Sequence, residues 1–383
     1  MPTGRRFRSN RGDGRFSGSL GALHARLKAS PPRLCFDPQM PPDDFAAWRN
    51  ALRDRLRELM QLDLAGAQPP PELRATEQRD GYELQKWEAF CDDFGVVPFL
   101  VLVPHTATPA SPGPAVLCCP GSRGTKELLA GEAEPDGRPT EDKHPLRNRM
   151  ALWFARAGFV AVAVDNPGIG EQADPGVGER FELSMHAIWM GTSYEAISVA
   201  QKLPVLDWLR HQSFVDPERI ALCGHSLGAK PALIVGALDD GVAAVIWNDF
   251  CSDWRQRAIL TGMDPIAVHQ YVPGMLRWMD YTDILASLAP RPLLITEGGR
   301  TPDIHRIRAA YGLLGAADRM HVEYYPRFAT PDLRPHDTED LREGLSGEEY
   351  LERVNVDVPQ HCFKDSVAVP WLSEVLGPVE GAN

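Results

Sequence analysis

No apolar run in the sequence is long enough to cross a membrane, and the arginine-containing N-terminus has no apolar segment typical of a secretory signal. The seven cysteines, an odd number, show no Cys-x-x-Cys spacing. Cys118, Cys119 and Cys223 lie inside apolar runs, which indicates buried thiols in a reducing compartment rather than a disulfide framework. We therefore expect a cytoplasmic protein with no membrane partner.

Positive charge is also scarce, because the net charge is −12. An acidic protein of this kind is poorly suited to bind a phosphate backbone, so we expect no nucleic-acid partner. The exception is residues 1–33, which contain eight Lys or Arg and one Asp. This stretch is rich in Arg, Gly and Ser and has little apolar pattern, so it is predicted to be a disordered basic tail.

The length of 383 residues allows one large domain with insertions or two smaller ones. Residues 34–80 are predicted to form an N-terminal helical segment. Apolar side chains there recur at spacings of three and four, namely Phe45, Trp48, Leu52, Leu56, Leu59 and Met60. Residues 81–383 are predicted to form the main domain.

Within 81–383, strand-like apolar runs alternate with helical patterns. The predicted strands are 82–90, 96–103, 115–119, 158–164, 220–223, 242–247, 293–296 and 322–325, and the clearest helices are 147–157 and 194–209. This alternation predicts an α/β fold with a mostly parallel central sheet and helices on both faces. Residues 250–285, rich in aromatic residues and Met, and the acidic residues 327–358 interrupt the pattern. The first is expected to be a lid or pocket wall, or else a plain insertion.

One stretch organises the domain, running from Arg219 to Lys230. A short apolar run ends in Gly-His-Ser-Leu-Gly, and a helix-compatible segment follows at once. This is the Gly-x-Ser-x-Gly pattern in its required context of strand, sharp turn and helix. Ser226 would stand exposed above the sheet as a nucleophile, and the backbone N–H of Leu227 could bind an oxyanion. The alternative is an ordinary tight turn between strand and helix.

A second loop follows the predicted strand 115–119 and reads Pro-Gly-Ser-Arg-Gly-Thr-Lys-Glu. A Gly-rich loop at the exit of a buried strand can present free backbone N–H groups. A phosphate-binding loop is not expected, because Lys126 is followed by Glu127 rather than by Ser or Thr.

These stretches together resemble the α/β-hydrolase superfamily, and within it the dienelactone-hydrolase-like and acetyl-xylan-esterase-like bacterial hydrolases. The resemblance covers roughly residues 82–376. It includes the loop that ends in Lys126-Glu127, the Asp-Pro-Glu-Arg-Ile segment 216–220 before the serine, and the Ala-Pro-Arg-Pro segment 289–292. A late His361 followed by a helical pattern completes it.

The resemblance implies a catalytic triad in the chain order Ser, acid, His. It implies Ser226 as nucleophile and His361 as general base. The acid departs from the pattern, because Thr301 stands where the family usually has Asp. We favour Glu297, at the end of a predicted strand, over Asp303, whose place in a first helical turn has a structural explanation. Asp249, after the preceding strand, is the third candidate.

The family also draws a second oxyanion donor from the Gly-rich loop, which implies the backbone N–H of Ser122 beside that of Leu227. The expected function is a serine hydrolase that cleaves a small ester or lactone through an acyl-enzyme, with no metal and no organic cofactor. Two alternatives remain: an amidase or peptidase with the same triad, and a non-catalytic binding protein on a hydrolase scaffold. The sequence leaves the oligomeric state open.

Overall fold

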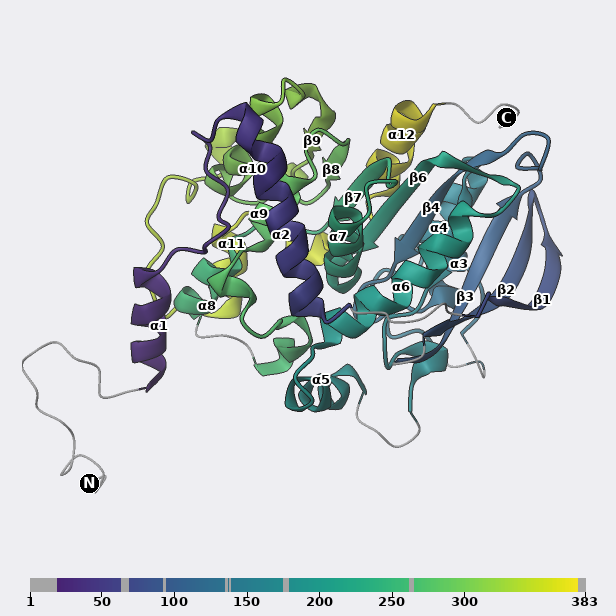
Figure 1. The fold of residues 1–383 in the computed structure, drawn as a ribbon, viewed down its shortest axis with the longest axis horizontal. Coiled ribbons are helices and arrows are strands. Elements are labelled where there is room, and N and C mark those ends of the chain that lie inside the picture. Colours follow the sequence, from purple (N-terminus) through teal and green to yellow (C-terminus); the bar gives the residue numbers. More distant parts are fainter. Residues whose placement is uncertain are drawn as a thin grey trace, which may run out of the picture.

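A computed structural model describes residues 19–62, 69–91, 94–134, 137, 139–174, 179–261 and 265–377 (Figure 1). The strands are β1 (Glu72–Arg79), β2 (Tyr82–Cys91), β3 (Gly95–Pro104), β4 (Gly113–Cys119), β5 (Val160–Val164), β6 (Val215–His225), β7 (Ala244–Asn248), β8 (Leu293–Ile295) and β9 (Met320–Val322). The helices are α1 (Ser19–Ala29), α2 (Phe45–Met60), α3 (Lys126–Ala130), α4 (Met150–Arg156), α5 (Glu179–Trp189), α6 (Tyr194–Arg210), α7 (Ala229–Leu238), α8 (Trp254–Thr261), α9 (Tyr281–Ser287), α10 (Thr301–Leu313), α11 (Gly347–Arg353) and α12 (Asp365–Leu376).

The strands form one sheet in the order β1-β2-β3-β5-β4-β6-β7-β8-β9. The pairs from β5 to β9 are parallel, and β1, β2 and β3 add an antiparallel meander at one edge. The expected mostly parallel sheet is therefore confirmed. The meander follows from short connections, since β1 and β2 are joined by a two-residue turn around Gly81.

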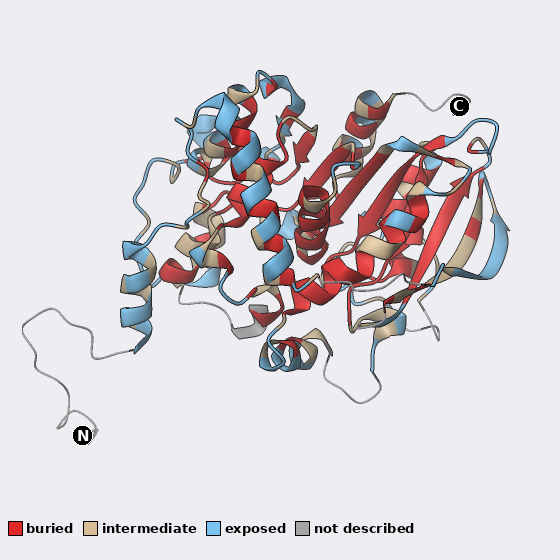
Figure 2. Ribbon diagram, in the orientation of Figure 1, coloured by how far each residue is buried: buried red, intermediate tan, exposed pale blue. Residues whose placement is uncertain are grey.

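Strands β4 and β5 are buried along their whole length because both faces of the sheet are covered (Figure 2). On one face, the larger side chains of β5, such as Val162, pack with α2, α6, α7, α9 and α10. On the other face, small side chains such as Ala161 and Ala163 pack against α4 and α12. This alternation of large and small residues lets α4 and α12 pack closely on the second face.

Three parts of the N- and C-terminal regions differ from the sequence-based expectation. The predicted disordered tail 1–33 contains α1; its residues 1–18 lie outside the described residues. The predicted helical segment 34–80 contains α2 but also β1, whose mainly exposed polar side chains gave no apolar pattern. The last strand is Met320–Val322 rather than 322–325.

Both interruptions of the α/β alternation are folded beside the end of the sheet. The first contains α8 and α9, and the second contains α11. A small apolar core around Tyr325, Phe328 and Tyr350 joins the second interruption to Leu260 of α8. None of the helices in the described part of the chain is both long and apolar enough to cross a bilayer.

The carboxyl ends of the parallel strands β4 to β8 meet at one edge of the sheet, because parallel strands share a direction. Polar residues follow each of these ends: the 120–122 loop after β4, Asp165 after β5, Ser226 after β6, Asp249 after β7 and Glu297 after β8. Open α/β sheets bind their ligands at this edge.

Candidate active site

The predicted turn at Ser226 has the strained geometry that a nucleophile elbow requires. Ser226 has a φ of 51°, a left-handed conformation that a residue with a side chain rarely adopts. The strand and helix approach so closely that a Cβ at position 224 would lie 2.2 Å from the carbonyl oxygen of Gly228. A Cβ at position 228 would lie 2.4 Å from the oxygen of Cys119. The two glycines therefore let the chain place a half-buried serine above the sheet.

The 120–122 loop lies directly against this elbow. A Cβ at Gly121 would be 2.9 Å from Cδ2 of His225 and 3.6 Å from Cβ of Ser226. The loop thus brings the backbone of Gly121 beside His225 and Ser226. The predicted oxyanion donors, the backbone N–H groups of Ser122 and Leu227, belong to the residues that follow Gly121 and Ser226 in the sequence.

A buried polar network that includes Asp165 and Asn166 holds the 120–122 loop and the residues that follow it. Nδ2 of Asn166 donates to the carbonyl oxygen of Pro120 at 2.8 Å, and the N–H of Lys126 donates to Oδ1 of Asp165 at 2.6 Å. The Lys126 ammonium lies 3.0 Å from Oδ2 of the same carboxylate, and both side chains are fully buried. Burial raises the pKa of Asp165 to about 6, although the positive charge of Lys126 opposes that shift.

His361 and Glu297 form the central pair of the site. Nδ1 of His361 lies 2.5 Å from Oε2 of Glu297, whose side chain is inaccessible to solvent, while the His361 side chain is 27% exposed. Burial alone would raise the pKa of Glu297, but the charge and hydrogen bond of His361, with the charge of Lys364, lower it to about 2. Burial lowers the pKa of His361, and the Glu297 carboxylate outweighs this and raises it.

Lys364 occupies the second oxygen of that carboxylate. Its Nζ donates to Oε1 of Glu297 at 3.0 Å and to the carbonyl oxygen of Cys362 at 2.9 Å. The Glu297 carboxylate is therefore fixed between an imidazole and an ammonium group that both come from the segment 361–364. Sequence reasoning missed Lys364, because its contact with Glu297 joins segments that are far apart in the sequence.

Asn248, the last residue of β7, connects the elbow to the histidine segment. Its Nδ2 lies 2.9 Å from Nδ1 of His225 and donates to the carbonyl oxygen of Cys362 at 3.1 Å. Its Oδ1 accepts the N–H of Lys364 at 3.0 Å. His225 and Asn248 are also register partners in the sheet. This fully buried amide therefore bridges two of the segments that supply the candidate catalytic residues.

His225 lies beside His361, with 4.8 Å between the ring centroids. Burial, followed by the neighbouring His361, lowers the pKa of His225 to about 4. His225, Glu297 and His361 are also the one group of described residues whose donor atoms are close enough for a metal ion, lying within 4.8 Å of one another. Nδ1 of His361 and Oε2 of Glu297 are joined by their hydrogen bond, so an ion bound through Nδ1 would displace that bond.

The two other candidate acids have other partners, although the charge of Asp249 also contributes to the raised pKa of His361. Asp249 pairs with the Lys230 ammonium, which also donates to the carbonyl oxygen of Ser226 at 3.1 Å. The structure brings neither Asp249 nor Asp303 into a hydrogen bond with His361. Asp303 lies in the first turn of α10, and burial, followed by the charge of Asp253, raises its pKa to about 7. Helix α10 begins at Thr301 itself, after an Arg300 cap.

The stretch 250–285 lines a cavity only in part, and none of Ser226, His361 and Glu297 lines that cavity. Trp254, Met275 and Tyr281 line a cavity of about 750 Å³. Met279 is instead fully buried in the main core, and Trp278 lies against the guanidinium groups of Arg33 and Arg55.

Comparison with known proteins agrees with this architecture. The protein-family model described as "Abhydrolase family" matches residues 3–374 of this chain. A crystal structure described as a "putative acetyl xylan esterase" from Bacteroides fragilis NCTC 9343 is 36% identical, with a TM-score of 0.88 over 96% of this chain and 97% of that one. A glucuronoyl esterase from Solibacter usitatus, at 17% identity, shares the fold with a TM-score of 0.52 over 85% of this chain and 96% of that one.

A curated relative, the "Putative hydrolase YtaP" of Bacillus subtilis (strain 168), is 27% identical over 179 residues. That match covers 43% of this chain and 57% of the relative.

Proposed function

The chain belongs to the abhydrolase family and is a hydrolase, and we propose that it is a serine esterase that cleaves carboxylic esters through an acyl-enzyme. The observation that carries the proposal is the hydrogen bond between His361 and Glu297 at the sheet edge where Ser226 adopts its left-handed conformation. A serine hydroxyl needs an adjacent base to attack a carbonyl, and that base needs an orienting acceptor.

In this mechanism Ser226 attacks the ester carbonyl while Nε2 of His361, the ring nitrogen not used by Glu297, takes the hydroxyl proton. The backbone N–H groups of Leu227 and Ser122 stabilise the oxyanion. His361 then returns the proton to the leaving alcohol, and water repeats the sequence on the acyl-enzyme to release the acid. Glu297 keeps the imidazole in the required tautomer and stabilises the imidazolium.

The comparisons support a substrate class for this proposal. The "putative acetyl xylan esterase" at 36% identity over nearly the whole of both chains favours a short acyl group, acetyl, on a carbohydrate alcohol. We prefer an esterase over an amidase because this similar protein is described as a "putative acetyl xylan esterase". A non-catalytic scaffold is disfavoured because a buried carboxylate does partner His361, although Thr301 stands where the family usually has its acid.

The test uses active-site labelling and matched substrates. A fluorophosphonate should label the wild-type protein and not Ser226→Ala, which should lose turnover on the order of 10⁴-fold or more while its melting temperature stays unchanged. Acetylated xylo-oligosaccharides should be hydrolysed faster than butyryl esters and faster than the matching acetamides. Residual activity of Ser226→Ala within tenfold of wild type would overturn the mechanism.

A further inference from the structure

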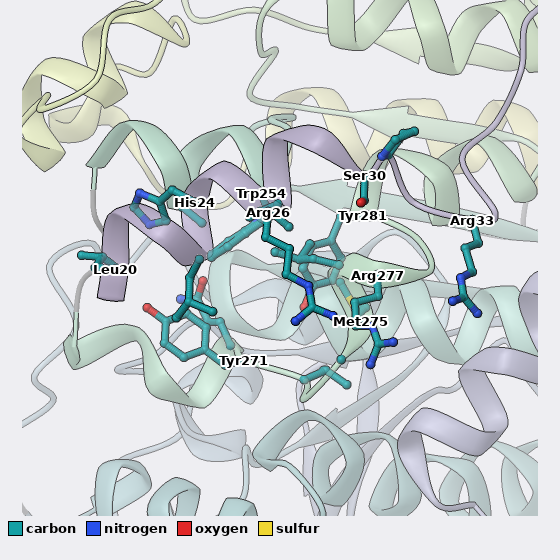
Figure 3. A pocket seen from close by; sticks show the side chains of 18 residues that line it. Leu20, His24, Arg26, Ser30, Arg33, Trp254, Tyr271, Met275, Arg277 and Tyr281 are labelled. Carbon is teal, nitrogen blue, oxygen red and sulfur yellow. The ribbon is translucent and has the colours of Figure 1, made fainter. Parts of the chain in front are cut away.

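A second site is indicated by a cavity between α1 and the segment 270–277 (Figure 3). Its volume is about 750 Å³, within the roughly 300–1,000 Å³ typical of small-molecule sites. Its walls come from α1, the following residues 30–33, α8, the segment 270–277 and the start of α9. None of Ser226, His361 and Glu297 lines it.

The walls of this cavity are mainly apolar. Leu20, Leu23 and Leu27 of α1 recur at spacings of three and four, so they share one face of the helix. Trp254 and Tyr281 lie across from them. Helix α1 buries none of its residues, and Leu20 and Leu23 are 54% and 60% exposed. An apolar helix face that lines a cavity instead of packing into a core would gain free energy from an apolar ligand.

The charged side chains around the cavity are all positive. Arg26, Arg33 and Arg277 line it, and no Asp or Glu does, in a chain whose net charge is −12. Among the described residues, no carboxylate forms an ion pair with any of the three, whereas Arg79 and Arg306 pair with Glu132 and Asp283. Figure 3 shows the guanidinium groups of Arg26 and Arg277 close to the middle of the cavity.

Helix α1 is fixed to the domain at its C-terminal end. Nε of Arg255 donates to the carbonyl oxygen of Leu27 at 2.9 Å, and its Nη2 donates to that of Lys28 at 3.1 Å. The Lys28 ammonium pairs with Glu343. The cavity is therefore bounded by a helix with defined attachments on one side and by α8 and the 270–277 segment on the other.

We propose that this cavity binds an amphiphilic organic anion, with its carboxylate or sulfonate at Arg26 and Arg277 and its apolar body against Leu20, Leu23 and Trp254. The planar guanidinium fork matches a carboxylate with two parallel hydrogen bonds. The apolar body removes the leucine face of α1 from water. This site is separate from the proposed active site and does not depend on the esterase function.

The test measures binding of octanoate by isothermal titration calorimetry, with octan-1-ol as the uncharged probe of equal chain length. Wild-type protein should bind octanoate at one site and octan-1-ol at least tenfold more weakly. The double variant Arg26→Ala/Arg277→Ala should lose at least tenfold in octanoate affinity, and so should Leu23→Asp. Arg308→Ala, an exposed arginine of α10, is the matched control and should bind as wild type does.

Ser226→Ala separates this proposal from the proposed function, because it should bind octanoate with unchanged affinity. Loss of binding in Ser226→Ala would place octanoate in the active site and overturn the proposal. Absence of binding to wild type, or equal affinity in the double arginine variant, would also overturn it. So would association only with anionic phosphatidylglycerol vesicles and not with free octanoate.

Discussion

Both carboxylate oxygens of Glu297 bind side chains of the segment 361–364. Oε2 lies 2.5 Å from Nδ1 of His361, and Oε1 accepts a hydrogen bond from Nζ of Lys364 at 3.0 Å. The carboxylate is fully buried and cannot exchange these partners for water. An acid held in this way orients the imidazole without a further conformational step, which is the requirement for the third member of a triad.

Glu297→Gln tests this relationship. We expect kcat to fall by roughly 10²-fold or more, because an amide can present its NH₂ group to Nδ1 and favour the wrong tautomer. Asp303→Asn is the matched control and should cost at most a few-fold in kcat, because Asp303 lies on α10 and forms no hydrogen bond with His361 in the structure. Steady-state kinetics on an acetyl ester measures both, and a larger loss in Asp303→Asn would transfer the acid role to Asp303.

Much of this fold could be predicted because buried parallel strands have a simple signature. The runs that form β4, β5 and the second half of β6, residues 220–223, are apolar and end at polar or Gly-rich turns, so the sequence showed where each strand ends and which polar residues follow it. Ser226 directly follows β6, and Glu297 lies two residues after the end of β8. β1 could not be found in this way, because an exposed edge strand needs no apolar side chains.

The partners of the candidate triad were harder to predict because they depend on contacts between distant segments. Asn248 ends an apolar strand like any other polar residue, and only the sheet register places it beside His225. Met279 was assigned wrongly for a different reason. Its place in a Met-rich stretch indicated a pocket wall, but its side chain lies in the core. Composition identifies such a stretch without saying which side chains face a cavity.

The pH dependence of the reaction should reveal His361. Its pKa is raised above the ordinary value of 6.5 despite burial, because the Glu297 carboxylate favours the imidazolium. As pH falls through this raised pKa the base becomes protonated, so kcat/KM should decline below an inflection above 6.5. His225, with a pKa of about 4, stays neutral in this range. A pH–rate profile flat down to pH 5 would contradict the assignment of His361 as base.

The same profile should move to lower pH in Glu297→Gln, because removing the carboxylate removes the attraction that raises the pKa of His361. The residual activity of Glu297→Gln on a reactive ester, such as an aryl acetate, allows its pH–rate profile to be measured. An unchanged inflection would mean that another group controls the acid limb.

Lys364→Met should shift the acid limb in the opposite direction. Loss of the ammonium leaves the Glu297 charge directed to His361 alone, so the imidazolium is favoured and the inflection of kcat/KM should rise in pH. We expect kcat to change only a few-fold, because the bond between His361 and Glu297 remains. Arg308→Met removes an exposed positive charge from α10 and is the control. A downward shift in Lys364→Met would show that Lys364 does not act through Glu297.

Asn248→Ala should reduce kcat by about tenfold or more while KM changes little. The amide connects His225 to the carbonyl of Cys362 and the N–H of Lys364, so its loss frees the segment that carries His361. Ser287→Ala removes a buried hydroxyl on α9 that bonds only to the carbonyl of Ile284, and it serves as the stability control. If both variants lose the same activity for the same fall in melting temperature, Asn248 has a general structural role only.

The last prediction concerns the network behind the 120–122 loop. Lys126 is fully buried and lies 3.0 Å from Asp165 and 2.7 Å from Glu127. Lys126→Met should lower the free energy of unfolding by about 3–5 kcal/mol, because breaking a buried pair leaves an uncompensated charge in the interior. Arg123 follows the 120–122 loop and forms an exposed ion pair with Glu141. Arg123→Met breaks this pair and should lower the free energy of unfolding by less than about 1 kcal/mol. Urea denaturation at pH 7 measures both; equal losses would show that the pair of Lys126 and Asp165 does not stabilise the loop beyond a surface contact.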